Sequence, residues 1–215
     1  MVIEAPGSTQ RRRGAQRDTR SGIDETTYQM ILPIVQTGNP VLRRVGRELT
    51  AEEIRSPAIQ RLIESMRDTM RAAPGVGLAA PQIGEAIQLA VIEDRAEYIQ
   101  DSSAEQLEER NRSVIEFHVI VNPKLTLLDD GSAAFFEGCL SVEGYQAVVR
   151  RAYRVRVECL NEKGQPITID AEGWYARILQ HEIDHLNGKL YIDRMESRTF
   201  TTNENLIRYL KDDRL

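Results

Sequence analysis

Residues 180–188 read Gln-His-Glu-Ile-Asp-His-Leu-Asn-Gly and contain the pattern H-E-x-x-H. Apolar side chains recur through the preceding residues and Asn-Gly is a typical helix end, so we expect a helix over roughly residues 172–186. His181 and His185 would then lie one turn apart on one face, where both imidazoles can bind one metal ion. Glu182 lies one residue off that line, close enough to touch a metal-bound water without being a ligand itself.

A catalytic metal ion usually has three protein ligands, so two histidines leave it one short. We consider Cys139 a candidate third ligand, because it is framed by a glycine in the turn-like stretch Glu-Gly-Cys-Leu-Ser (residues 137–141) and a thiolate binds first-row metals strongly. Familiar H-E-x-x-H proteases instead take a ligand from downstream of the motif. The downstream carboxylates that remain as alternatives are Asp193, Glu196 and Glu204. Cys159 alternates with valines, as in a half-buried strand, and is expected to pack in the core.

Residues 75–82, GVGLAAPQ, form a glycine-rich loop after a predicted helix. The dinucleotide-binding fingerprint needs its glycines after a strand, so we exclude a dinucleotide site here. The glycines allow close approach of a ligand to the backbone, and the Gln82 amide can donate to a carbonyl oxygen. The loop is therefore a candidate ligand-binding segment.

The other periodic segments predict an α+β fold. After the helix-start signal Ser56-Pro57, apolar side chains recur with a 3.6-residue period up to Met70, which indicates an amphipathic helix. Apolar or alternating runs predict strands at residues 88–92, 114–122, 145–149, 154–160 and 166–170. Short turns between several of them favour antiparallel pairing. We expect antiparallel β-strands packed around a central helix that carries the H-E-x-x-H motif.

The chain is long enough for one substantial domain. Residues 1–30 are rich in arginine and small polar residues without apolar periodicity, and we expect a disordered N-terminal arm. Residues 31–197 are expected to form a single catalytic domain, and residues 198–215 a C-terminal tail.

Residues 93–116 separate the first two predicted strands and are acidic and rich in helix-forming residues. Ser102 and Glu105 have the spacing of a capping box, which predicts a helix start. We interpret the segment as a surface insertion whose charges are solvated.

Composition excludes some classes of function. The chain has 28 basic and 33 acidic residues, a net charge of −5, which argues against non-specific nucleic-acid binding, and we expect no specific DNA partner. Its apolar runs are far shorter than the ~20 residues of a membrane-spanning helix, so we expect no membrane association.

Three motifs together resemble the signature motifs of the peptide deformylases. They are G-x-G-x-A-A-x-Q at residues 75–82, E-G-C-L-S at residues 137–141, and Q-H-E-x-D-H-L-x-G at residues 180–188. Their order and spacing match, and the resemblance covers roughly residues 34–195. The sequence is most similar to the organelle-related subtype, some members of which are bacterial.

The resemblance implies removal of the formyl group from the N-terminal formylmethionine of new polypeptides. It implies a metal ion held by Cys139, His181 and His185, with Glu182 accepting and returning a proton. The Gln82 amide and the Leu140 backbone N–H are implied as donors to the developing oxyanion. Substrate contacts are implied at five further residues, namely Val76, Gly77, Glu137, Gly138 and Trp174, the last near the methionine side chain.

The resemblance further implies Fe²⁺ as the metal in the cell, with Zn²⁺, Ni²⁺ or Co²⁺ as substitutes, and formylmethionyl nascent peptides as partners. It favours the bacterial cytoplasm, leaves a mitochondrion or plastid as the alternative, and leaves open a transient contact with the ribosome. Two other classes of protein remain as alternatives from the residues alone. One is an H-E-x-x-H metallopeptidase, and the other is a non-catalytic binding module stabilised by zinc.

Overall fold

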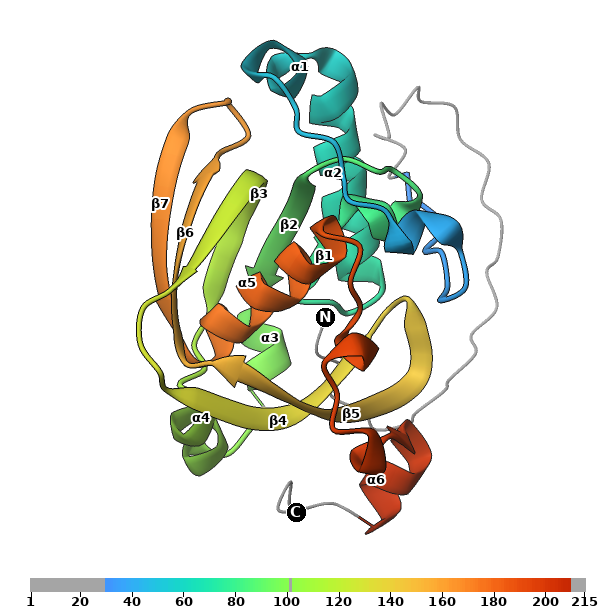
Figure 1. The fold of residues 1–215 in the computed structure, drawn as a ribbon, viewed down its shortest axis with the longest axis vertical. Coiled ribbons are helices and arrows are strands. Elements are labelled where there is room, and N and C mark those ends of the chain that lie inside the picture. The colour runs from blue at the N-terminus through green and yellow to red at the C-terminus, as the bar shows by residue number, and fades with distance from the viewer. Residues whose placement is uncertain (1–29, 101, 210–215) are drawn as a thin grey trace, which may run out of the picture.

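The computed structural model describes residues 30–100 and 102–209 and confirms the predicted α+β fold (Figure 1). Five antiparallel strands form one sheet in the order β1-β2-β3-β6-β7, and three form a second in the order β4-β5-β8. The strands are β1 (Gly77–Ala79), β2 (Leu89–Asp94), β3 (Ile115–Leu127), β4 (Ser132–Cys139), β5 (Val142–Ala152), β6 (Arg154–Leu160), β7 (Pro166–Glu172) and β8 (Thr201–Thr202). The α-helices are α1 (Ala51–Arg55), α2 (Pro57–Ala72), α3 (Ala96–Ile99), α4 (Ala104–Arg110), α5 (Gly173–Leu186) and α6 (Asn203–Tyr209).

The five-stranded sheet lies between two helices, with α2 on one face and α5 on the other. Successive side chains of a strand point to opposite faces. In β2, Leu89 and Val91 pack in the apolar cluster that includes Met66 of α2, whereas Ala90 and Ile92 pack in the cluster that includes α5. Both faces of this sheet are therefore buried where the helices cover it.

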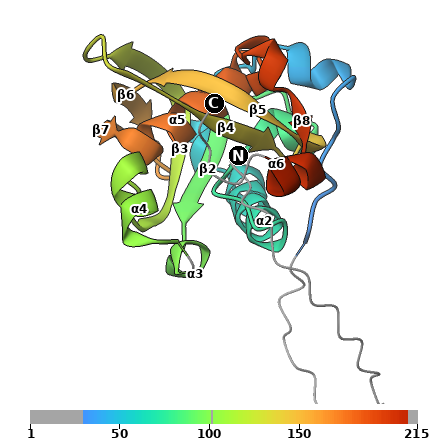
Figure 2. The ribbon, with the colours of Figure 1, turned by 90° about the horizontal axis from the view of Figure 1, so that it is seen from below.

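The second sheet brings the long hairpin of β4 and β5 against α5, so the helix contacts strands of both sheets. Figure 2 shows β4 and β5 crossing the molecule, with α2 and α6 towards one side and α4 towards the other. We expected a turn around Cys139, but Cys139 is the last residue of β4, where the β4–β5 register shifts. The strand continues because residues 133–138 pair with β5 without interruption.

Both long helices begin and end close to their predicted limits. The hydroxyl of Ser56 caps α2 by accepting a hydrogen bond from the backbone N–H of Ile59, and Pro57 is the first helical residue. The predicted helix over residues 172–186 is α5, in which all but two residues are buried. This helix is the central element of the fold.

Residues 93–116 contain the end of β2, the short helices α3 and α4, and the start of β3. A buried ion pair anchors the segment, because Nε of Arg112 lies 2.8 Å from a carboxylate oxygen of Asp94. The helix start predicted at Ser102 lies one residue later: Ser103 caps α4, and its capping-box partner is Gln106. Both serines satisfy the spacing rule, and the sequence pattern does not distinguish them.

Beyond the central helix, residues 198–209 of the expected tail contain β8 and α6, and β8 pairs with β5 at Tyr145 and Gln146. Residues 1–29 of the expected N-terminal arm lie outside the described part of the chain. Among the described residues, no helix has the length and apolar character needed to cross a membrane.

We predict that Gly173→Ala destabilises the protein by about 3 kcal/mol in urea unfolding. Gly173 has a φ of +57°, and a Cβ there would lie 2.6 Å from the carbonyl oxygen of Arg110. Gly84→Ala is the matched control, because φ is +92° but no atom of the described residues lies within 4 Å of the added Cβ. The control should lose only about 1 kcal/mol, the backbone cost alone. Equal losses for the two variants would contradict this account of where α5 begins.

Candidate metal centre

The metal-binding group combines two side chains of α5 with one from the end of β4. The ligand-type atoms of Cys139, His181 and His185 lie within 4.8 Å of one another, and all three residues are buried. Nε2 of His185 lies 3.3 Å from Sγ of Cys139 and 3.2 Å from Nε2 of His181. The structure thus places together the three residues that the sequence singled out.

These distances fit ligands of one metal ion. Nitrogen and sulfur ligands of a tetrahedral ion, at about 2.0–2.3 Å from it, lie roughly 3.3–3.6 Å from each other. The two distances that involve His185 are close to that range. A thiolate and two imidazoles suit several first-row divalent metals.

Glu137 orients one of the histidines. Its Oε2 lies 3.0 Å from Nδ1 of His181, so the ring presents Nε2 to the other ligand atoms. Both carboxylate oxygens also accept from Arg151, at 3.0 and 2.9 Å. A carboxylate behind a ligating histidine fixes its ring and its tautomer.

The electrostatics favour the ligand forms of these groups. Burial alone would raise the pKa of the Cys139 thiol, but hydrogen bonds with His181 and with the Ser141 N–H lower it below its ordinary value. Burial and the neighbouring His181 hold the pKa of His185 well below its ordinary value, so this imidazole is neutral. Burial opposes a charge on Glu137 as well, yet Arg151 and His181 hold its pKa well below the usual range. A metal ion binds thiolate and neutral imidazole, so both shifts favour the forms of Cys139 and His185 that bind it.

Glu182 lies against the glycine-rich loop. It is fully buried on α5, and a methyl group added to Gly77 of β1 would overlap its carboxylate. Gly77 therefore lacks a side chain because the carboxylate of Glu182 takes up that space. We had expected the glycines of this loop to allow close approach of a ligand. In the structure, Gly77 allows close approach of Glu182, the predicted base.

Gln82 is also buried beside the cluster. Its Oε1 accepts from the backbone N–H of Ala79 at 2.9 Å, which directs the amide nitrogen towards Sγ of Cys139 at 3.5 Å. Ser141 Oγ lies 3.4 Å from the same nitrogen. A donor aimed at the metal-binding group is the arrangement an oxyanion hole requires. Leu140, the other expected donor, directly follows Cys139, and its carbonyl oxygen accepts from Gln36.

The expected substrate contacts are distributed unevenly. Gly77 lies against the carboxylate of Glu182, and Val76 directly precedes it in the loop. The Glu137 side chain has no exposed surface and is engaged by charged partners, so its carboxylate orients His181 instead of facing a substrate. Gly138 directly precedes Cys139 in β4 and pairs with Gln146 of β5. Trp174 is buried at the start of α5, with the guanidinium of Arg112 4.8 Å from its ring centroid.

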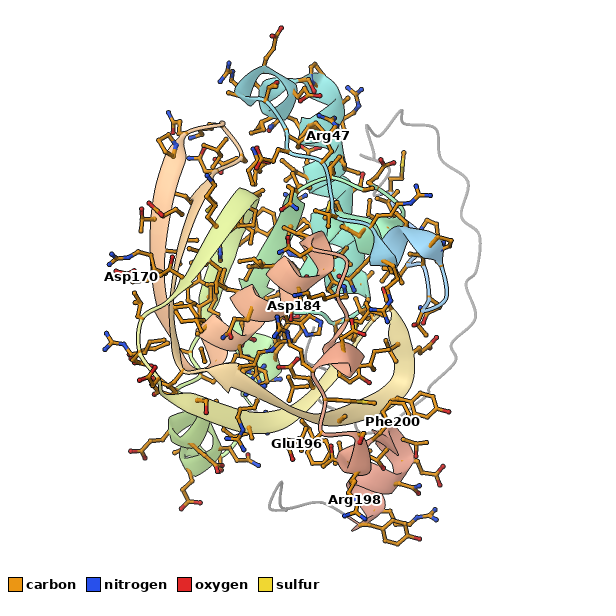
Figure 3. All side chains as sticks on the ribbon, viewed as in Figure 1. Arg47, Asp170, Asp184, Glu196, Arg198 and Phe200 are labelled. Atoms are coloured by element: carbon orange, nitrogen blue, oxygen red, sulfur yellow. The ribbon has the colours of Figure 1, made fainter. Side chains whose placement is uncertain are left out.

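The downstream carboxylates have other partners. Asp193 pairs with Arg43 and accepts from the backbone N–H of Leu190. Glu204 pairs with Arg208 of α6. Figure 3 shows Glu196 beside β5, and a guanidinium nitrogen of Arg150 lies 3.7 Å from its carboxylate. The same figure shows Asp184 on α5. Among the described residues, the group of metal-ligand type includes Cys139 and none of these three downstream acids.

Two of the cavities in the described part of the chain are lined by residues next to site residues in the sequence. One of about 510 Å³ is lined by Leu140, Glu143 and Gly144 on one side and by Ala72 and Ala73 on the other. It therefore adjoins the turn that follows Cys139. The second, of about 680 Å³, lies behind α5, where Ile183 and Asp184 line it. None of the three metal-ligand residues lines either cavity.

The role of the Glu137 side chain was missed from sequence, as were its arginine partners. A signal was available, because Glu137 and Cys139 are two residues apart and side chains at that spacing lie on one face of a strand. We did not use it because we expected a turn there. The arginines that pair with Glu137 come from β5 and α5, and no local pattern joins them to it.

Comparisons with known proteins show similarity to a single family. The family model described as polypeptide deformylase matches residues 31–201. The chain is 49% identical over 185 residues to the chloroplastic peptide deformylase 1A of Solanum lycopersicum, covering 86% of this chain and 67% of the relative. It is 44% identical over 197 residues to peptide deformylase 1 of Bifidobacterium longum, covering 92% and 88%. A crystal structure of a class I type b peptide deformylase from Acinetobacter baumannii, with Met-Ala-Ser bound, superposes with a TM-score of 0.69 at 30% identity, covering 78% of this chain and 99% of the other.

We predict that Cys139→Ala lowers metal affinity by at least about 10²-fold, because one of three protein ligands is lost. Cys159→Ala is the matched control: Cys159 is also buried, but burial raises the pKa of its thiol to about 11 and it lies in β6. Metal content after dialysis against a graded chelator measures the difference. Full metal retention by the Cys139 variant would exclude Cys139 as a ligand.

We predict that Gly77→Ala lowers kcat by about 10²-fold, since the added methyl group must displace Glu182 from beside the centre. Metal content should stay at the wild-type level, because Glu182 is not among the ligand atoms. Steady-state kinetics and metal analysis of the same sample check both halves. Unchanged kcat would show that the position of Glu182 is unimportant.

Proposed function

Because the chain belongs to the polypeptide deformylase family, we propose that Glu182 moves the proton in its reaction, at a metal ion held by Cys139, His181 and His185. The chain is an enzyme that removes the N-terminal formyl group from new polypeptides. The single observation that supports these roles best is the position of Glu182. This residue directly follows His181, and its buried carboxylate packs against Gly77.

The three ligand residues fit a divalent metal ion, and we propose Fe²⁺ in the cell, with Zn²⁺, Ni²⁺ or Co²⁺ as substitutes. Thiolate and imidazole ligands alone do not select among these metals. When bound, such an ion lowers the pKa of a water and polarises a carbonyl oxygen. Glu137 holds His181 in the orientation that binding requires.

Hydrolysis needs a group that takes a proton from water and delivers it to the leaving amine. Glu182 has that role: its carboxylate accepts the proton as the water oxygen attacks the formyl carbon. When the carbon–nitrogen bond breaks, the carboxylic acid returns the proton to the nitrogen of the methionine. The products are formate and a polypeptide with a free α-amine, and Glu182 is again ionised.

The formyl oxygen gains negative charge during the attack. The Gln82 amide nitrogen is directed towards the centre by the Ala79 N–H that holds its other end, so it donates without reorganising. The Leu140 backbone N–H is the second proposed donor. One such donor typically contributes about 10²–10³ in rate.

The substrate lies between the glycine-rich loop and β4. We propose that Val76, Gly77 and the Gly138 segment contact its backbone, and that Trp174 lies near the methionine side chain. The cavity of about 510 Å³ beside Leu140 suits the residues that follow the methionine. The Acinetobacter baumannii relative was crystallised with Met-Ala-Ser, a peptide of the length such a groove would accept.

The relatives come from bacteria and from plant organelles. We place this chain in the bacterial cytoplasm, with a mitochondrion or plastid as the alternative. We leave a transient contact with the ribosome as a hypothesis, and a binding titration with ribosomes would test it.

The test is anaerobic turnover of formyl-Met-Ala-Ser by protein loaded with Fe²⁺ or Ni²⁺. We expect release of formate that a chelator abolishes, and Glu182→Ala should lower kcat by about 10²–10⁴-fold while the metal stays bound. Cleavage of an internal peptide bond without formate release would favour a metallopeptidase instead. A metal-loaded protein with no hydrolytic activity would favour the structural-zinc module.

A further inference from the structure

Arg177 lies on α5 one turn before His181, and the interior of the protein surrounds it. Its side chain is 2% exposed, which is rare for a guanidinium and costly unless each polar group has a partner. Residues four apart on a helix share a face, so Arg177 and His181 point in the same direction. Both reach the same carboxylate, that of Glu137 on β4.

The contacts of Arg177 join three elements. Nη1 donates to Oε1 of Glu137 at 2.5 Å and to the carbonyl oxygen of Val149 in β5 at 2.9 Å. Nη2 donates to the carbonyl oxygen of Ala133 in β4 at 2.6 Å. The guanidinium thus lies at a fixed distance from both strands of the hairpin that presents Cys139.

Glu137 has no acceptor position to spare. An ionised carboxylate accepts at about four lone-pair sites. Oε1 accepts from Arg151 and Arg177, and Oε2 accepts from Arg151 and His181. Arg177 and Arg151 together fill the positions on Oε1, and with Oε1 held the carboxylate keeps Oε2 directed towards Nδ1 of His181.

Arg177 holds Oε1 from α5, the helix that carries His181, whereas both oxygens of Glu137 are also bonded from β5 by Arg151. Nη1 of Arg151 pairs with Asp184, which also accepts from Arg194 at 2.6 and 2.7 Å. Arg151 is therefore divided between two carboxylates. Among the described residues, the carboxylate that pairs with Arg177 is that of Glu137.

We propose that Arg177 is a positioning residue of the metal centre, which acts through Glu137 to hold the His181 ring in the orientation that binds the metal. The inference rests on the proposed function, because it presumes a metal ion at Cys139, His181 and His185. Arg177 itself touches none of the reacting atoms.

The test measures how the centre holds Co²⁺, as well as activity. In Arg177→Met we expect Co²⁺ to be lost to a chelator about tenfold faster than in the wild type, with a changed visible absorption spectrum of the bound Co²⁺. Removing one partner of a buried ion pair is destabilising, but Glu137 keeps Arg151 as a charged partner in this variant, so the uncharged Met, which is similar in length, is the first choice. Arg177→Lys retains the charge and is the variant to measure if Arg177→Met does not fold. Its rate of Co²⁺ loss should lie between the wild-type rate and the rate expected for Arg177→Met.

Two further variants separate positioning from general destabilisation. Arg112→Met removes another buried arginine with a bidentate carboxylate partner, Asp94, and should leave the rate of Co²⁺ loss within about twofold of the wild type. In a Glu137→Gln background, Arg177→Met should cause no further change, since its effect passes through Glu137.

Four outcomes would overturn the inference. A folded Arg177 variant, whether Met or Lys, with the wild-type Co²⁺ spectrum and rate would show that Arg177 has only a structural role. An equal effect of Arg112→Met, or full additivity with Glu137→Gln, would show the same. A wild-type protein that takes up no Co²⁺ would overturn the proposed metal centre together with this inference, whereas the first outcomes leave the proposed function intact.

Discussion

The close approach of the end of β4 to the middle of α5 is the constraint on which the site depends. It leaves Sγ of Cys139 only 3.3 Å from Nε2 of His185. These residues are 46 positions apart and belong to different layers, so an error in the packing of the hairpin would separate the ligands. The buried carboxylate of Glu137 counteracts such an error, because it bonds to β5 through Arg151 and to α5 through Arg177 and His181.

A helix with this many polar residues in its interior-facing stripe is unusual for a core element. Burying unpaired charges costs several kcal/mol each, so the charged side chains of α5 need partners, and the amide of Gln180 is paired as well. The side-chain amide of Gln180 accepts from the N–H of Ala152 and donates to its C=O, so it bonds to the last residue of β5 as a neighbouring strand would. Asp184 pairs with two arginines. The helix is thus held by directional bonds on the side of the second sheet and by apolar packing on the side of the first.

Much of this was predictable from local patterns, and what was missed depends on contacts between distant residues. The helix, the histidine pair and Cys139 followed from short-range spacing, and the structure brings all three ligands together. The strand β4 was missed because Gly138 and the apolar run before it do not alternate clearly, and pairing with β5 decides its conformation. The packing of Glu182 on Gly77 and the arginines around Glu137 join segments far apart in the chain, and a period or motif carries no information about them.

X-ray absorption at the zinc edge of zinc-loaded protein tests the central claim most directly, because it reports the ligand atoms themselves. The account predicts one sulfur at about 2.3 Å and two imidazole nitrogens at about 2.0–2.1 Å, with the remaining position filled by a light atom. A shell of nitrogen and oxygen alone would contradict it, since β4 would then contribute no ligand.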